Sequence, residues 1–241
     1  MVYLNRIINK IKRLFAKRQY RLIENNLEKY NDVWQNEAIP EKQLKLTGNN
    51  FLNNIKNDRT VKSLKEIFFA INGETILEIG CSSGYYSEIL KKLGLNLKYE
   101  GCDYSQKFIA LAKQKYPGEK FEIMDATDLK YENDSFDTVF NARCLFHILN
   151  YQKAIAESAR VSKKYIIFSG ITTLHLHKTI YAEKTAYGVN MLEIFFNENE
   201  LVDLFKKNNL AVIKINSSHY FYIEELTEPI FIKNYLCKKI K

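Results

Sequence analysis

Residues 75–88 read TILEIGCSSGYYSE. Three apolar residues and a lone acid, Glu78, precede a small-residue loop between Gly80 and Gly84. Glycine lets a backbone turn tightly and approach a ligand where a Cβ would collide. The stretch therefore predicts a strand, a ligand-binding loop and a helix. It does not fit the nicotinamide pattern G-x-G-x-x-G, and an acid directly before the loop suits a ligand that carries positive charge.

Strand-like and helical runs alternate on the C-terminal side of this stretch. Six strands joined by crossover helices predict an α/β fold with a doubly wound, mostly parallel sheet. Only three residues separate the last two runs, so a hairpin and an antiparallel seventh strand are expected. The strand-like runs are 75–79, 97–102, 120–124, 136–141, 165–170, 211–216 and 220–224, and the helical runs are 84–93, 105–116, 151–162 and 197–208.

The sequence LEIGCSSG resembles the first motif of the class I S-adenosylmethionine-dependent methyltransferases, an acid followed after one residue by a glycine-rich loop. The resemblance extends from about residue 73 to residue 224. It implies a Rossmann-like methyltransferase domain, S-adenosyl-L-methionine as the cofactor and methyl transfer as the activity. The family usually has a proline–glycine turn before the fifth strand, whereas this chain reads RVSKKYIIF, which we expect to alter a surface turn only.

The same resemblance implies a set of cofactor-binding residues. Asp103, at the end of the second strand, would accept from both ribose hydroxyls, and Asp125, after the third strand, would accept from the adenine amino group. Asn141 and Ala142 would lie near the methionine portion. The full set is Glu78, Gly80, Cys81, Ser82, Gly84, Tyr85, Asp103, Tyr104, Asp125, Ala126, Asn141 and Ala142.

The acceptor side offers fewer signals. His147 is the candidate general base, because a reference pKa of about 6.5 suits proton acceptance near neutrality; the alternative is a packing role. Arg143 either holds an anionic group of the acceptor or is a solvated residue at a helix start. Trp34, the only tryptophan, either closes over a ligand or anchors packing. Residues 171–197 follow the fifth strand, where the family commonly builds its substrate pocket. The pocket candidates there are His175, His177, Tyr181 and Tyr187, and no metal site is expected.

The net charge of +8 lies almost wholly in residues 1–23, which carry seven bases and no acid. Apolar residues recur there at helical spacing and predict a basic amphipathic helix over 3–23, with further helices over 41–55 and 60–70. Such a helix attaches to an anionic membrane surface, to RNA or to a partner, or packs on its own domain. Four cysteines without a C-x-x-C pair, and no apolar run of roughly 18 residues, favour a cytoplasmic protein, peripheral at the inner membrane.

Three regions are expected: a helical extension over 1–72, the methyltransferase domain over 73–226 with a substrate-side insertion over 171–197, and a basic tail over 227–241. The expected activity is methylation of a small-molecule or glycan-precursor acceptor. The alternatives are an RNA methyltransferase with a basic N-terminal arm and an inactive binding or scaffold module. Nucleic acid is not favoured, because NARC stands where base-amino methyltransferases have an Asn/Asp-Pro-Pro-aromatic motif.

Overall fold

The computed structural model describes residues 20–47 and 59–240. Most of the amphipathic helix predicted over 3–23 lies outside the described residues. Its last four residues correct that prediction, because Tyr20–Ile23 form strand β1, which pairs with β7 (Ile180–Ala186). The helix predicted over 41–55 is described only in part, as α2 (Ala38–Thr47). The helix predicted over 60–70 is α4 (Arg59–Phe68).

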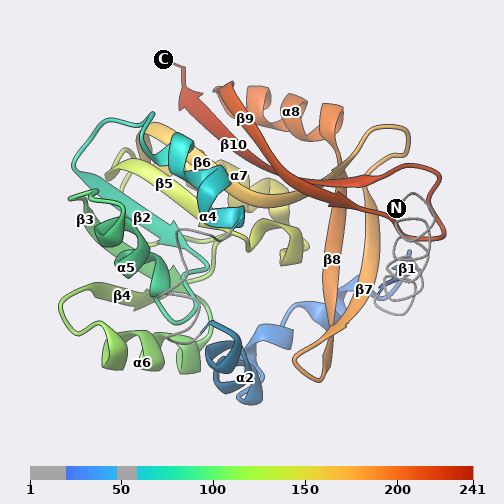
Figure 1. The fold of residues 1–241 in the computed structure, drawn as a ribbon, viewed down its shortest axis with the longest axis horizontal. Coiled ribbons are helices and arrows are strands. Elements are labelled where there is room, and N and C mark those ends of the chain that lie inside the picture. The colour runs from blue at the N-terminus through green and yellow to red at the C-terminus, as the bar shows by residue number, and fades with distance from the viewer. Residues whose placement is uncertain (1–19, 48–58, 241) are drawn as a thin grey trace, which may run out of the picture.

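A mostly parallel sheet forms the centre of the molecule and confirms the predicted fold class (Figure 1). Its parallel strands lie in the order β6-β5-β2-β3-β4, and β10 and then β9 continue the sheet beyond β6. The strands are β2 (Thr75–Ile79), β3 (Lys98–Asp103), β4 (Lys120–Ile123), β5 (Phe136–Ala142), β6 (Ser162–Leu174), β9 (Leu210–Phe221) and β10 (Ile230–Lys239).

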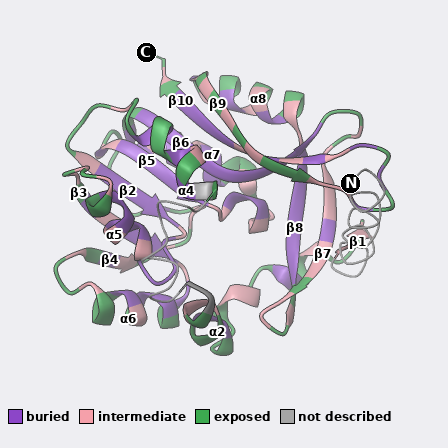
Figure 2. Ribbon diagram, in the orientation of Figure 1, coloured by how far each residue is buried: buried purple, intermediate pink, exposed green. Residues whose placement is uncertain are grey.

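Helices cover both faces of this sheet. Successive strand residues point to opposite faces of the sheet, and Ile76 and Leu77 belong to different core clusters, so both faces are apolar. One face packs on α4, α5 and α6, and the other on α7 and α8. The crossover helices are α5 (Tyr85–Lys92), α6 (Gln106–Lys115), α7 (Tyr151–Val161) and α8 (Glu198–Lys207). Figure 2 shows that the purple, buried residues follow the central strands.

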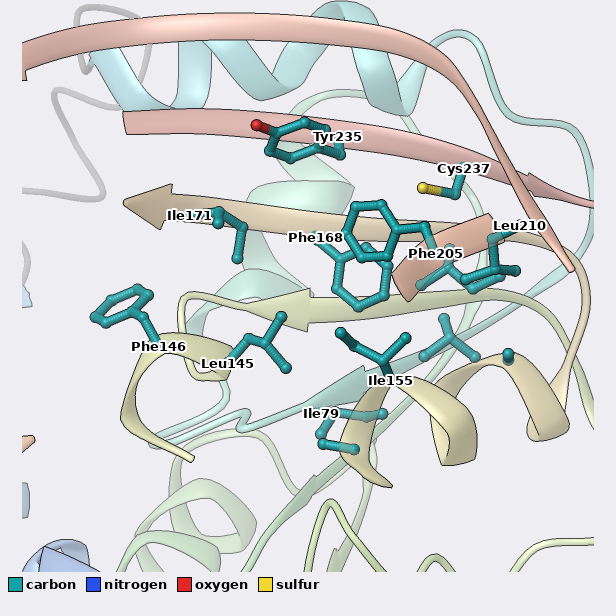
Figure 3. Close-up of a cluster of buried hydrophobic side chains, with 14 of the residues drawn as sticks. Ile79, Leu145, Phe146, Ile155, Phe168, Ile171, Phe205, Leu210, Tyr235 and Cys237 are labelled. Atoms are coloured by element: carbon teal, nitrogen blue, oxygen red, sulfur yellow. The ribbon is translucent and has the colours of Figure 1, made fainter. Parts of the chain in front are cut away.

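The C-terminus corrects two expectations. Residues 211–216 and 220–224 were expected as two strands of a hairpin, but β9 runs without a break from Leu210 to Phe221. The antiparallel strand is β10, which lies between β6 and β9 in the region expected to be a basic tail. The lysines suggested a tail, yet Tyr235, Leu236 and Cys237 are fully buried. Figure 3 shows Tyr235 and Cys237 in the apolar layer, with Phe168 of β6 stacked on Phe205 of α8 at 4.6 Å.

A smaller antiparallel sheet leaves the central one at the end of β6. It consists of β1, β7 and β8 (Val189–Asn197), and the last two residues of β8 pair in parallel with those of β6. Tyr187 and Gly188 join β7 to β8 with φ values of +53° and +77°, as a two-residue type I′ turn requires. Figure 1 shows this sheet at an angle to the central strands, with the chain running from β1 to α2 across the space between them.

The described residues contain no helix of the length and apolar character that a membrane span requires. The short elements along residues 20–47 are η1 (Leu27–Tyr30) and η2 (Val33–Gln35), and η4 (Leu145–His147) follows β5. Together with the β7–β8 hairpin, η2 and η4 enclose the open edge of the sheet.

Candidate active site

A cavity of about 610 Å³ lies at the carboxyl ends of the parallel strands. Ligands bind at this edge in doubly wound sheets, and the size is typical of small-molecule sites. The loops after β2, β3, β4 and β5 form one side of the cavity, and the β1–β7–β8 sheet and η2 form the other. We call these sides the strand-end half and the hairpin half.

The loop after β2 is held by its neighbours in the strand-end half. Gly80 has φ +71°, and a Cβ at this position would lie 2.5 Å from Cys144 Cβ, so only glycine fits. The Ser82 amide donates to Asp103 Oδ2 at 3.0 Å, and the Ser105 amide donates to Oδ1 at 2.9 Å. Backbone amides therefore fix Asp103 at the cavity wall.

Burial raises the pKa of Asp103 to about 6, although the backbone amides that donate to it oppose the rise. Asp125 follows β4, and its Oδ1 accepts from the Thr127 amide at 2.7 Å. Both carboxylates line the cavity, as do Tyr104 and Ala126. Two hydrogen-bond acceptors at adjacent strand ends suit a ribose diol and an exocyclic amine, so the residues present fit S-adenosylmethionine.

The structure brings most of the predicted cofactor residues to the cavity. Those that line it are Gly80, Ser82, Tyr85, Asp103, Tyr104, Asp125, Ala126 and Ala142. Glu78, Cys81, Gly84 and Asn141 do not line it. The Glu78 side chain is fully buried beneath the loop, accepts from the Tyr99 hydroxyl and has a pKa raised well above its usual value by that burial. Asn141 points away to Ser158 of α7.

The hairpin half presents side chains that the sequence interpretation missed. Tyr20 pairs with Lys184, and Lys184 pairs with Met191, so these residues share one face with Glu193, two positions further along β8. Glu193 is 3% exposed and lines the cavity. Its Oε1 accepts from the Tyr20 hydroxyl at 3.2 Å, and its Oε2 lies 3.1 Å from Lys184 Nζ. The sequence signal for this hairpin was the pair of strand-like runs on either side of Gly188.

His147 of η4 lies between the two halves. Its Nδ1 is 2.5 Å from the Leu192 carbonyl oxygen, so Nδ1 carries the proton and Nε2 is the acceptor. Burial lowers the pKa of His147 to about 3, which keeps the ring neutral at physiological pH. The reference pKa of about 6.5 therefore does not apply to this buried ring. The Trp34 ring lies 4.9 Å from the imidazole and 5.9 Å from the Tyr187 ring, so Trp34 covers the cavity.

Three predicted pocket residues lie elsewhere. The Glu228 carboxylate accepts from the backbone amides of residues 175–177, which turns this segment away from the cavity. His177 Nδ1 lies 2.8 Å from Glu228, and His175 Nδ1 lies 3.4 Å from Glu198. Tyr181 packs against the core below the hairpin, and only Tyr187 of the four candidates lines the cavity. Within the described ranges, no three His, Cys, Asp or Glu side chains form a metal-binding group.

Comparisons with known proteins agree with this geometry. A family model described as a methyltransferase domain matches residues 77–168. The ubiquinone biosynthesis O-methyltransferase of Pelagibacter ubique is 28% identical over 181 residues, which cover 69% of this chain and 74% of that protein. The demethylmenaquinone methyltransferase of Thermotoga maritima is 25% identical, over 43% of this chain and 45% of that protein.

Among solved structures, the magnesium protoporphyrin IX methyltransferase of Synechocystis PCC 6803 with bound S-adenosylmethionine superposes with a TM-score of 0.63. The superposition covers 91% of this chain and 100% of that chain, at 15% sequence identity. It shows that the two proteins share a fold.

Proposed function

Because the chain belongs to the class I S-adenosylmethionine-dependent methyltransferases, we propose that it methylates a hydroxyl group of a small-molecule acceptor. One observation carries the proposal: a single cavity joins two carboxylates at adjacent strand ends to a second compartment that ends at a neutral histidine. The ubiquinone biosynthesis relative, named as an O-methyltransferase, supports a hydroxyl acceptor.

The strand-end half would hold the cofactor. Asp103 would accept from the ribose hydroxyls and Asp125 from the adenine amino group, while the loop from Gly80 to Ser82 would face the methionine portion. S-adenosylmethionine, when bound, supplies a methyl group on a positively charged sulfur. Trp34, Phe146 and Tyr187 line the cavity with aromatic surface and would exclude water, which helps to align two reactants.

His147 would orient the acceptor. Its Nδ1 proton is held by the Leu192 carbonyl, so Nε2 is the nitrogen that accepts a hydrogen bond from a hydroxyl. A base with a pKa of about 3 holds a proton weakly, so its contribution is chiefly to position the hydroxyl oxygen and receive its proton transiently. The rate constant should therefore be independent of this group between about pH 5 and 9.

Transfer of labelled methyl groups tests the proposal. S-adenosyl-L-methionine carrying a radioactive methyl group would be incubated with the protein and either 3,4-dihydroxybenzoate or bulk RNA. We expect label in the phenolic product, and His147→Ala should lower kcat by roughly tenfold or more while calorimetric binding of S-adenosylhomocysteine stays unchanged. Label in RNA alone would support the RNA alternative, and absent binding of S-adenosylhomocysteine would contradict the proposal.

Attachment through the N-terminal helix stays a prediction. Residues 3–19, which carry its basic and apolar faces, lie outside the described residues. Co-sedimentation of the full chain with vesicles of anionic or neutral lipid would test a membrane role. Salt-sensitive RNA binding that is lost on deletion of residues 1–19 would favour the RNA role instead.

A further inference from the structure

We infer that Arg143 binds an acidic group of the acceptor, so that this enzyme selects small hydroxylated acids. The inference rests on the proposed function and adds the substrate class. It depends on the placement of one guanidinium group, on the lack of a partner for it among the described residues, and on the distribution of charge in the cavity.

Two backbone positions with positive φ, Arg143 and Gly170, determine where the Arg143 side chain lies. Arg143 itself has φ +57°, a conformation that a side chain other than glycine seldom adopts. Its side chain lies across Gly170, a residue within β6 that has φ +68°. A Cβ on Gly170 would lie 2.8 Å from Arg143 Cγ and 3.4 Å from Nη1, so the absence of a side chain at this position makes room for the arginine.

The backbone conformation at Gly170 is stabilised by a residue of the adjacent strand, β10. Asn234, which is 1% exposed, accepts from the Gly170 amide at 2.8 Å and donates to the Ser63 hydroxyl at 2.7 Å. The register of β10 shifts at the same point. A buried side-chain amide that accepts from the Gly170 N–H stabilises this backbone conformation, and with it the position of Arg143.

The Arg143 guanidinium is half-buried at the cavity wall. In residues 20–47 and 59–240, none accepts a hydrogen bond from it or forms an ion pair with it. The other cation of the wall, Lys184, faces Glu193. A partly buried guanidinium without an acceptor is unfavourable, so the cavity presents a positive charge that a ligand anion would compensate.

Negatively and positively charged side chains line different parts of the cavity. Asp103 and Asp125 line the strand-end half, where a positively charged cofactor fits. Arg143 lies against β6, and β5 and β2 separate β6 from the strands that carry Asp103 and Asp125. Arg143 and His147 line the same cavity and lie four positions apart in the chain. This placement favours the acceptor over the carboxylate of the cofactor as the bound anion.

The planar fork of an arginine matches the two oxygens of a carboxylate or of a phosphate. The sole tryptophan, Trp34, lies 4.9 Å from His147 and provides a fluorescence signal at the site. With S-adenosylhomocysteine saturating, we would titrate benzoate, its neutral isostere benzamide, and phenyl phosphate. We expect benzoate to bind about tenfold more tightly than benzamide, because a charge-assisted bidentate contact is lost with the amide. Tighter binding of phenyl phosphate than of benzoate would assign a phosphate acceptor.

Arg143→Gln should reduce benzoate binding to the level of benzamide, and Arg143→Lys should restore part of the difference. Arg21→Gln is the matched control. Arg21 is an exposed arginine that pairs with Glu183 in the β1–β7–β8 sheet. Equal binding of benzoate and benzamide by the wild-type protein, or no benzoate binding, would overturn the inference. So would an Arg143→Gln variant that loses S-adenosylhomocysteine affinity more than tenfold, since Arg143 would then serve the cofactor. Failure of the wild-type protein to bind S-adenosylhomocysteine would instead overturn the proposed function.

Discussion

The two halves of the cavity are built in different ways. The strand-end half comes from short loops that directly follow consecutive parallel strands, and backbone amides fix its main carboxylate, Asp103. The hairpin half is assembled from β1 and the β7–β8 hairpin, whose residues Tyr20 and Glu193 lie 173 positions apart. Backbone geometry thus specifies the strand-end half, whereas long-range side-chain pairs specify the hairpin half. This difference explains why a family can keep one cofactor and vary its acceptors.

Asp103→Ala should have the largest effect, a loss of affinity for S-adenosylhomocysteine that distinguishes the strand-end half from the hairpin half. The change removes the proposed acceptor of two ribose hydroxyls and leaves the Ser82 and Ser105 amides without their acceptor. We expect S-adenosylhomocysteine to bind roughly hundredfold more weakly, about 3 kcal/mol, as measured by calorimetry. Asp128→Ala removes an exposed carboxylate near Asp125 and serves as the control. A loss of less than threefold in Asp103→Ala would place the cofactor elsewhere.

The second-largest difference is expected in the pH dependence of binding: cofactor binding should depend on pH near 6, and acceptor binding should not. Asp103, with a pKa of about 6, must be ionised to accept from hydroxyls, so roughly a tenth of it is competent at pH 5. We expect S-adenosylhomocysteine affinity to fall about tenfold from pH 7 to pH 5, and to stay level in Asp103→Asn. Because the pKa is raised in the folded state, stability of the unliganded protein should decrease as pH rises from about 4 to about 6.

Calorimetry at both pH values tests the first expectation, and urea unfolding across pH 4 to 6 tests the second. His147, with its pKa of about 3, stays neutral throughout this window. Acceptor binding measured with cofactor saturating should therefore show no step from this residue. A step near pH 6 that persists in Asp103→Asn would show that another group controls cofactor binding.

The smallest effect is expected from Tyr104→Phe, which loosens the connection between the halves. The Tyr104 hydroxyl accepts from the Trp34 amide and donates to the Asn31 carbonyl, each at 3.0 Å. Loss of both bonds should weaken S-adenosylhomocysteine binding roughly fivefold, about 1 kcal/mol, and alter Trp34 fluorescence. Tyr116→Phe, which removes a hydroxyl bonded to Glu88, is the control. Unchanged fluorescence in Tyr104→Phe would show that Trp34 is held by its ring contacts alone.

The sequence predicts the strand-end half well, because each of its residues follows a strand whose pattern is local. Gly80 and Asp103 are recognisable without any knowledge of distant segments. Glu193 is not, because its role depends on pairing with β7 and on Tyr20 reaching the same face. Glu78 looked like a ligand-facing acid, yet alternation along β2 turns it into the core toward Tyr99.

The C-terminus shows a similar limit. The lysines of residues 227–241 suggested a basic tail, whereas the strand places Lys239 and Lys233 beside Asp134 and Glu198. It buries residues 234–237. Likewise, Tyr187 and Gly188 form a hairpin turn without the usual asparagine–glycine pair, so the turn was not recognised. In each case a tertiary contact decides the structure against the local composition.

Residues 20–47 touch both halves, through the Tyr104 bonds, the Trp34 ring and a hydrogen bond of 2.7 Å from Lys42 Nζ to the Tyr187 carbonyl. One continuous segment therefore contacts the loop after β3, the η4 histidine and the β7–β8 turn. For catalysis this makes exchange of ligands a shared event: departure of the methylated product and of the spent cofactor would depend on the same opening. The turnover number would then be limited by how often that segment lifts, and solvent viscosity would slow it even where the chemical step is fast.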